Sequence, residues 1–166
     1  MCDLINLFSN LDNIKAQGRL EEKLIPAYLH AENLQGVSFV DLKKLFDACD
    51  KTVLQQQAEQ QGHQPPTRDV SQKLNPFTVF RGCVGNEFRE GMSWTTDLYQ
   101  AIKYPKRAKS FNWHGNDADQ SCSVWCALVE LDEIYCYLNH YEPEFIVCPK
   151  DYWRVDIPQK FFEQQS

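Results

Sequence analysis

Three short motifs in the second half of the chain carry side chains that could do chemistry. Val79-Phe80-Arg81-Gly82 is an apolar run that ends in an arginine and a glycine, and Gly91 to Asp97 is rich in hydroxyl groups. The third motif, Tyr141 to Val147, places two acids one residue apart in front of an apolar run. A guanidinium group pairs bidentately with oxyanions, and a fixed carboxylate stabilises a developing cation. The three motifs together could therefore bind an anionic substrate and stabilise positive charge beside it.

In this order and at these spacings, the motifs resemble the mono-ADP-ribosyltransferase superfamily in its arginine-serine-glutamate class. The resemblance is closest to the small ADP-ribosyltransferase-like proteins of bacteria and their phages. It covers roughly residues 77–149 and nothing in the first 75. The family pattern has an Arg on the first core strand, a Ser-x-Ser/Thr on the second and a Glu-x-Glu or Gln-x-Glu before the fifth. These positions match, in the same order, Arg81, Ser93 with Thr95, and Glu142 with Glu144.

The resemblance implies an NAD-dependent transfer of ADP-ribose to an acceptor, with release of nicotinamide, by a bacterial or phage effector or toxin. Breaking the bond between nicotinamide and ribose creates an oxocarbenium-like cation, which a carboxylate close to the sugar would stabilise. Glu144 is the candidate for this role. Side chains two apart on a strand lie on the same face, and repulsion between like charges suits Glu142 to act as a general base. An isolated acid pair would instead be two solvated side chains at a strand start.

Several residues are expected to bind NAD. Arg81 would pair with the diphosphate or a ribose hydroxyl, and Gly82 would let the flat nicotinamide approach the backbone. Ser93 would orient the catalytic carboxylate, with Thr95 beside it, and Trp94 would lie in the core. The structural alternatives are a surface ion pair for the arginine, a bulge or turn for the glycine, and an N-cap for the serine. The aromatic wall of the nicotinamide site would come from Tyr99, Tyr104 or Phe111.

The acceptor is expected to be a macromolecule, with a protein arginine favoured because the acid-x-acid form resembles that of arginine-modifying members. The loop before the acid pair helps to choose the acceptor in that family, which suggests His140 and Tyr141 for this role. Pro143 departs from the pattern and restricts its position to a sheet edge or strand start. With water as acceptor the protein would be an NAD glycohydrolase. A noncatalytic interaction module on the same fold is the alternative from another class.

Seven cysteines are an odd number, and none forms a Cys-x-x-Cys pair, so free thiols are expected rather than disulfides or a metal site. A cysteine enzyme that uses Cys83 or Cys148 with His140 is a further alternative. No glycine-rich elbow or known Cys/His spacing supports it.

The composition limits the classes of partner. The chain has 166 residues, of which 43% are hydrophobic, so it can bury a core and is neither disordered nor fibrous. A net charge of −6 argues against a broad grip on nucleic acid. The sequence has neither the basic and apolar start of a secretion signal nor an apolar run of about 20 residues that could span a membrane. A cytoplasmic protein is therefore expected.

The elements that must position the motifs fall into an α+β order. Residues 1–60 are predicted to form a helical arm and residues 61–76 a linker. Residues 77–166 are predicted to form the split, mostly antiparallel β-sandwich that the resemblance implies, with NAD between its two sheets. The arm and the sandwich are expected to form one compact unit. The arm could brace the sandwich, cover the NAD site, or bind a target or a neutralising partner protein.

Local signals mark the individual elements. One helix is expected around residues 20–31, with Pro26 at a bend or a start, and a second is expected to begin at Ser38 and run beyond residue 53. A third would begin at Thr96 or Asp97 and be cut or kinked by Pro105. Strands are expected at 77–80, 122–131, 134–138 and 145–148, with 122–129 central because it is apolar on both faces.

Overall fold

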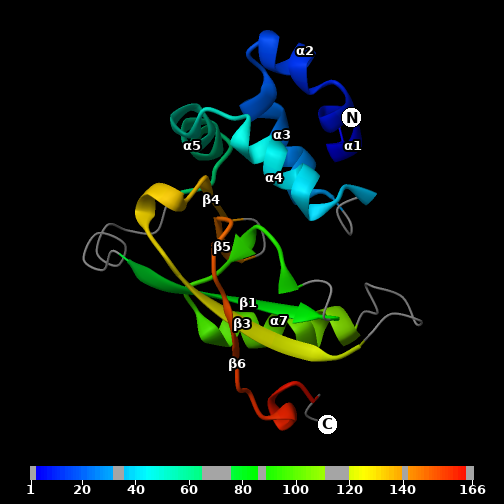
Figure 1. The fold of residues 1–166 in the computed structure, drawn as a ribbon, viewed down its shortest axis with the longest axis vertical. Helices are drawn as coiled ribbons and strands as arrows, with labels where there is room; N and C mark the ends of the chain where they lie inside the picture. Colours follow the sequence, from blue (N-terminus) through cyan, green and yellow to red (C-terminus); the bar gives the residue numbers. More distant parts are fainter. Residues whose placement is uncertain are drawn as a thin grey trace. The chain divides into compact units, whose positions relative to one another are not determined.

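The computed structural model describes residues 3–31, 36–64, 76–85, 89–110, 120–139 and 142–163. The fold is α+β, with a series of helices and two small antiparallel sheets (Figure 1). Its contacts divide the chain into two compact units. The helical unit comprises Met1–Pro65 with Tyr135–Pro143, and the sheet unit comprises Pro66–Ile134 with Glu144–Ser166.

The helical unit contains five α-helices and one strand among its described residues. They are α1 (Leu4–Ser9), α2 (Leu11–Ala16), α3 (Leu20–Leu29), α4 (Phe39–Asp47), α5 (Lys51–Gln60) and β4 (Cys136–Asn139). The apolar side chains that face inward are buried because their three- and four-residue spacing places them on one side of each helix. The most deeply buried are Leu4, Leu7, Leu20, Leu24, Ile25, Leu42, Leu45, Phe46 and Leu54.

Helix α3 continues through Pro26, where the sequence predicted a bend or a start. A proline has no N–H to donate to the carbonyl four residues earlier, which here belongs to Glu22. The side-chain amide of Gln61 donates to this carbonyl at 3.1 Å. A side chain from the end of α5 therefore satisfies the acceptor that the proline leaves open.

The prediction of one helix running from Ser38 beyond residue 53 is wrong, because the structure has two helices there. Ser38 caps α4 as predicted, and its hydroxyl accepts from the N–H of Asp41 at 3.1 Å. The chain then leaves the helix, and Asp50 begins α5 by accepting from the N–H of Val53. An aspartate favours an N-cap over a helix interior, which accounts for the break.

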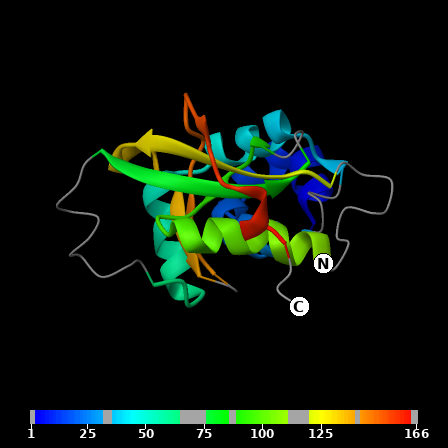
Figure 2. The ribbon, with the colours of Figure 1, turned by 90° about the horizontal axis from the view of Figure 1, so that it is seen from below.

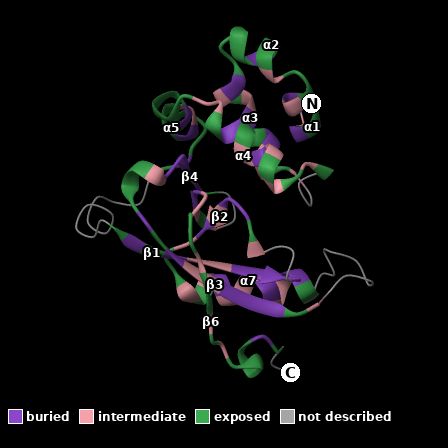
Figure 3. Ribbon diagram, in the orientation of Figure 1, coloured by how far each residue is buried: buried purple, intermediate pink, exposed green. Residues whose placement is uncertain are grey.

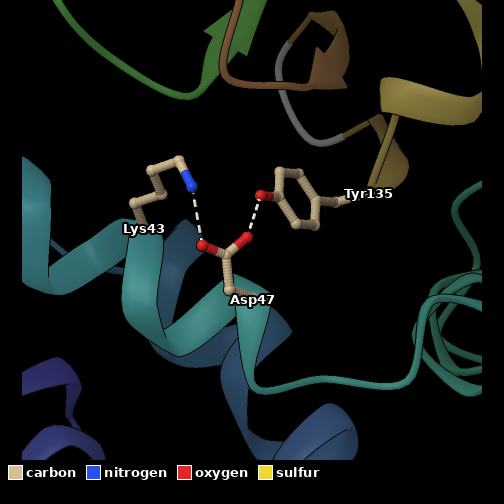
Figure 4. Close-up of polar contacts among 3 residues, drawn as sticks. All are labelled: Lys43, Asp47 and Tyr135. Carbon is tan, nitrogen blue, oxygen red and sulfur yellow. Dashed lines mark hydrogen bonds and ion pairs between the residues drawn. The ribbon is translucent and has the colours of Figure 1, made fainter.

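Tyr135 and Asn139 join β4 to the helices, although the sequence assigned this segment to the second half. The Tyr135 hydroxyl donates to the Asp47 carboxylate, which also receives a hydrogen bond from Lys43 (Figure 4). Partial burial raises the pKa of Asp47, but these two hydrogen bonds and the nearby lysine charges outweigh it and hold the pKa below its ordinary value. At the other end of β4, the N–H of Asn139 donates to Nδ1 of the buried His63 at 3.0 Å.

The first sheet of the sheet unit has the strand order β1–β3–β6, and both pairings are antiparallel. Its strands are β1 (Phe77–Val84), β3 (Cys122–Val129) and β6 (Trp153–Val155). β3 is the central strand, as its apolar character on both faces predicted. In the antiparallel register its buried residues lie opposite buried residues of β1, and Figure 3 colours the buried parts of both strands purple.

The second sheet contains the short strand β2 (Ser93–Trp94), which pairs antiparallel with β5 (Pro143–Ile146). Pro143 is the first residue of β5, which is a strand position that tolerates proline. An isolated bridge between Phe80 and Thr95 connects β1 to the residue that follows β2. Two short 3₁₀-helices, Leu131–Glu133 and Gln159–Phe161, complete the unit.

Helix α7 (Leu98–Ser110) lies across one face of the β1–β3 sheet (Figure 2). The Asp97 carboxylate accepts from the N–H of Tyr99 at 2.9 Å at the start of the helix, as an N-cap does. Pro105 lies inside α7, so the predicted cut does not occur there, whereas the alternative of a kink stays a prediction. The apolar core between helix and sheet contains Val84, Ala101, Ala108, Cys122, Val124 and Phe162.

No helix in the described part of the chain is both long and apolar enough to cross a membrane. The six described cysteines are free thiols, as predicted. Burial raises the pKa of two of them, Cys49 and Cys136, to about 12, so these thiols stay protonated at neutral pH.

Candidate functional site

The strand pairing in the sheet unit brings the three motifs together. In β2–β5, Ser93 pairs with Ile146 and Trp94 with Phe145, and Glu144 directly precedes Phe145 in β5. Thr95 is also bridged to Phe80, the residue before Arg81. The arginine, the serine and the glutamate therefore come from three separate stretches of chain and meet at one place.

Ser93 connects the arginine and the glutamate through different atoms. Its backbone carbonyl accepts a hydrogen bond from Nη1 of Arg81 at 3.0 Å. Its side-chain hydroxyl is hydrogen-bonded to the Glu144 carboxyl group. Ser93 therefore contacts both the Arg81 guanidinium group and the Glu144 carboxyl group.

Burial raises the pKa of Glu144 above the ordinary glutamate value. The hydrogen bond from Ser93 and the positive charge of Arg81 act in the opposite direction and limit this rise. Desolvation disfavours the ionised form, whereas a donor and a cation favour it. Burial is therefore the main cause of the shifted pKa of Glu144, and its two neighbours in the site reduce the shift.

Gly82 has a packing role that the sequence did not indicate. A Cβ atom built on Gly82 would lie 1.8 Å from the carbonyl oxygen of Ala101 and 2.7 Å from Cδ of Pro105. The Ala101 carbonyl is the group that would accept from residue 105, and proline has no N–H to donate. On the side where a side chain would project, Gly82 therefore contacts α7 rather than a ligand, and neither a bulge nor a turn explains it.

Thr95 and Tyr99 have structural contacts at the start of α7. The Thr95 hydroxyl accepts from the N–H of Asp97 at 3.1 Å, which is a turn contact. Tyr99 is 64% exposed, and its ring lies 5.1 Å from Nζ of Lys103. Trp94 is 2% exposed and lies in the core as predicted.

Tyr104 is the candidate aromatic residue on which Arg81 and Glu144 both act electrostatically. It is partly buried against the core of the sheet unit, and burial raises the pKa of its hydroxyl. The charges of Arg81 and Glu144 act on that hydroxyl in opposite directions, so Tyr104 lies within electrostatic range of both. Helical spacing was the signal that could have identified it, since Tyr104 shares a face of α7 with Ala101 and Ala108, whereas Tyr99 does not.

The expected acceptor-side residues are only partly described. Glu142 is half-buried directly before β5 and groups with the helical unit, and its role as a general base stays a prediction. The expected acceptor-recognition residues, His140 and Tyr141, lie outside the described residues, as does Phe111.

Two further observations concern metal ligands and Cys83, one of the two cysteines considered as a nucleophile. No group of three or more His, Cys, Asp or Glu side chains there could hold a metal ion. Cys83 is buried, and its thiol is hydrogen-bonded to the Ser123 hydroxyl at 3.1 Å. A buried, hydrogen-bonded thiol behaves as a small core residue.

No protein-family model matches the chain, and no curated protein or solved structure matches it either. The assignment of a function therefore rests on the geometry of Arg81, Ser93 and Glu144.

Proposed function

We propose that the protein is an NAD-dependent mono-ADP-ribosyltransferase. One observation carries the proposal: Ser93 is hydrogen-bonded to Arg81 through its carbonyl and to Glu144 through its hydroxyl. The sequence pattern of the arginine-serine-glutamate class requires these three side chains to act at one site. Glu144 comes from a stretch of chain well separated from Arg81 and Ser93, so a chance occurrence of the motifs gives no reason for the three to meet.

The donor set suits NAD as a co-substrate. The Arg81 guanidinium group stays charged and can pair with a diphosphate. The Glu144 carboxylate would stand beside the ribose, where positive charge develops as the bond from C1′ to nicotinamide breaks. The bonding electron pair leaves with nicotinamide, the acceptor nucleophile forms the new bond to C1′, and Glu142 takes the proton that the acceptor loses.

The remaining features of the proposal follow from this assignment. We infer that the two antiparallel sheets belong to the ADP-ribosyltransferase type of sandwich and that the acceptor is a protein, with arginine favoured. We also infer a cytoplasmic location, because free thiols suit a reducing compartment. The aromatic wall beside nicotinamide is assigned to Tyr104 rather than Tyr99, because Tyr104 lies in range of both charged groups.

Incubation with NAD labelled in its adenylate half tests the proposal. We expect label to appear on protein in a host-cell extract while nicotinamide is released, and Glu144→Gln should abolish both. Nicotinamide release without labelled protein would identify an NAD glycohydrolase instead. If the folded protein yields neither labelled protein nor nicotinamide, the proposal is overturned and the noncatalytic module remains.

Glu59→Gln is the matched control for this experiment. Glu59 is an exposed acid on α5, so the same change of charge is made away from the site. This variant should transfer label at the parent rate. Loss of transfer in both variants would show that net charge, rather than the site, controls the reaction.

A further inference from the structure

Gly91 is buried and lies directly against the guanidinium group of Arg81. A Cβ atom built on Gly91 would lie 2.2 Å from Cζ, 2.3 Å from Nη2 and 2.7 Å from Nε of that arginine. Real Cβ atoms essentially never come within 3.0 Å of another heavy atom. The present position of the guanidinium group therefore requires a residue without a side chain at position 91.

The requirement comes from space and not from backbone conformation. The described glycines with a positive φ angle are Gly18, Gly36, Gly62 and Gly85. Gly91 is not among them, so another residue could adopt its backbone angles. What a substitution at Gly91 would change is the surface that the arginine contacts.

That surface is held in place by two hydrogen bonds. The indole N–H of the buried Trp94 donates to the Gly91 carbonyl at 2.9 Å. The N–H of Val147 donates to the carbonyl of Met92 at 2.9 Å, which fixes the next residue to the end of β5. The Gly91 and Met92 carbonyls are therefore both hydrogen-bonded, so we expect an added methyl group to displace the flexible guanidinium group rather than this segment.

The same segment supplies the acceptor for Arg81, because Nη1 donates to the Ser93 carbonyl. The Ser93 carbonyl therefore binds the guanidinium group, and the missing side chain of Gly91 leaves the space that this group occupies. We propose that Gly91 is a positioning residue that fixes the Arg81 guanidinium group where it would receive the diphosphate of NAD. This inference rests on the proposed function for its substrate, but its geometry stands independently of it.

Gly91→Ala tests the inference. The added methyl group displaces the guanidinium group, so we expect the KM for NAD to rise about tenfold or more while kcat changes less. The Nε–Hε resonance of Arg81 in the NMR spectrum should shift at the same time. A merely structural role would lower the melting temperature without raising the KM of the protein that stays folded.

Gly18→Ala is the matched control, because nothing lies within 4 Å of its Cβ position and its φ of +67° makes the substitution strained. It should lower stability and leave both the KM and the Arg81 resonance unchanged. In an Arg81→Lys background, Gly91→Ala should change the KM by less than about twofold, because the planar group that the methyl displaces is gone.

Three outcomes decide the inference. An unchanged KM together with an unshifted Arg81 resonance in Gly91→Ala would overturn it. If the parent does not consume NAD, the proposed function fails, and the Arg81 resonance alone decides the positioning role. If Gly91→Ala does not fold, Trp94→Phe removes the donor to Gly91 and keeps an aromatic ring, and an unshifted Arg81 resonance there would contradict the inference.

Discussion

Ser93 keeps the cation and the anion of the site in place with two separate groups. Its carbonyl accepts from Arg81, and its hydroxyl is bound to Glu144. Because this hydroxyl favours the ionised carboxylate, it acts against the burial that raises the pKa of Glu144. The serine therefore sets the pH range in which the carboxylate carries its charge.

Ser93→Ala should consequently move the activity toward higher pH. Loss of the donor raises the pKa of Glu144 further, so the acid limb of the kcat/KM profile shifts to higher pH and the rate on that limb falls. Nicotinamide release measured from pH 5 to pH 9 checks this. Thr78→Ala, which removes an exposed hydroxyl from β1, should leave the limb unchanged. An acid limb at the parent position in Ser93→Ala would contradict this role of the hydroxyl.

Glu144→Gln should make the protein more stable at neutral pH although it is inactive. The raised pKa of Glu144 means that the folded state holds the proton more tightly than the unfolded state. The stability that this contributes is complete below the ordinary glutamate pKa and is lost as the pH rises through the raised value. Glutamine is neutral at every pH, so its melting temperature should exceed that of the parent at pH 7.5 and equal it near pH 4. A lower melting temperature at pH 7.5 would show that the ionised group stabilises the fold.

At the scale of elements, the contact between α7 and β1 determines where Tyr104 lies. The helix lies against β1 at Gly82, where the Ala101 carbonyl occupies the space of a side chain. Tyr104 comes directly before Pro105, which also lies against Gly82. The packing of α7 on β1 at this glycine therefore brings Tyr104 toward Arg81 and Glu144.

Gly82→Ala should therefore destabilise the protein and move α7. The added methyl group would meet the backbone carbonyl of Ala101, which cannot rotate away as a side chain could. We therefore expect a loss of about 2–3 kcal/mol in the free energy of unfolding. Urea denaturation followed by circular dichroism measures this loss. A change below about 0.5 kcal/mol would mean that α7 can move without cost and that the glycine is not required for packing.

Elements with local signals were predictable, and those that depend on distant contacts were not. Ser38 and Asp97 act as N-caps as their positions indicated, and the apolar run of β3 identified the central strand. The break between α4 and α5 was missed because the apolar stripe continues across it. A helix with a bend or a start at Pro26 was expected, but the donor that satisfies the Glu22 carbonyl could not be, since Gln61 lies 39 residues after Glu22.

At the scale of the whole molecule, the chain leaves the helical unit after Pro65 and returns to it at Tyr135. The first half is therefore not a simple appended arm, because β4 from the second half completes it. Sequence spacing could not reveal this, since the Tyr135 hydroxyl and the Asp47 carboxylate are 88 residues apart. The three-motif pattern did identify Arg81, Ser93 and Glu144, which the structure brings together, whereas the packing of Gly82 against α7 needed the fold.

Tyr135→Phe should weaken the helical unit. The change removes the hydroxyl that donates to Asp47. Of the two hydrogen bonds drawn in Figure 4, only the one from Lys43 to Asp47 then remains. The expected loss is about 1 kcal/mol in the free energy of unfolding, measured with urea. Tyr99→Phe, which removes a hydroxyl from a 64% exposed side chain, should have almost no effect. Equal losses in the two variants would show that the hydrogen bond to Asp47 contributes nothing.

Release of nicotinamide from NAD by the purified full-length protein is the most direct test of the account. The parent and Glu59→Gln should release nicotinamide at the same rate, and Glu144→Gln should be slower by at least about 100-fold while remaining folded. Release by Glu144→Gln at the parent rate, or no release by any of the three folded proteins, would contradict the claim that Arg81, Ser93 and Glu144 form an ADP-ribosyl transfer site.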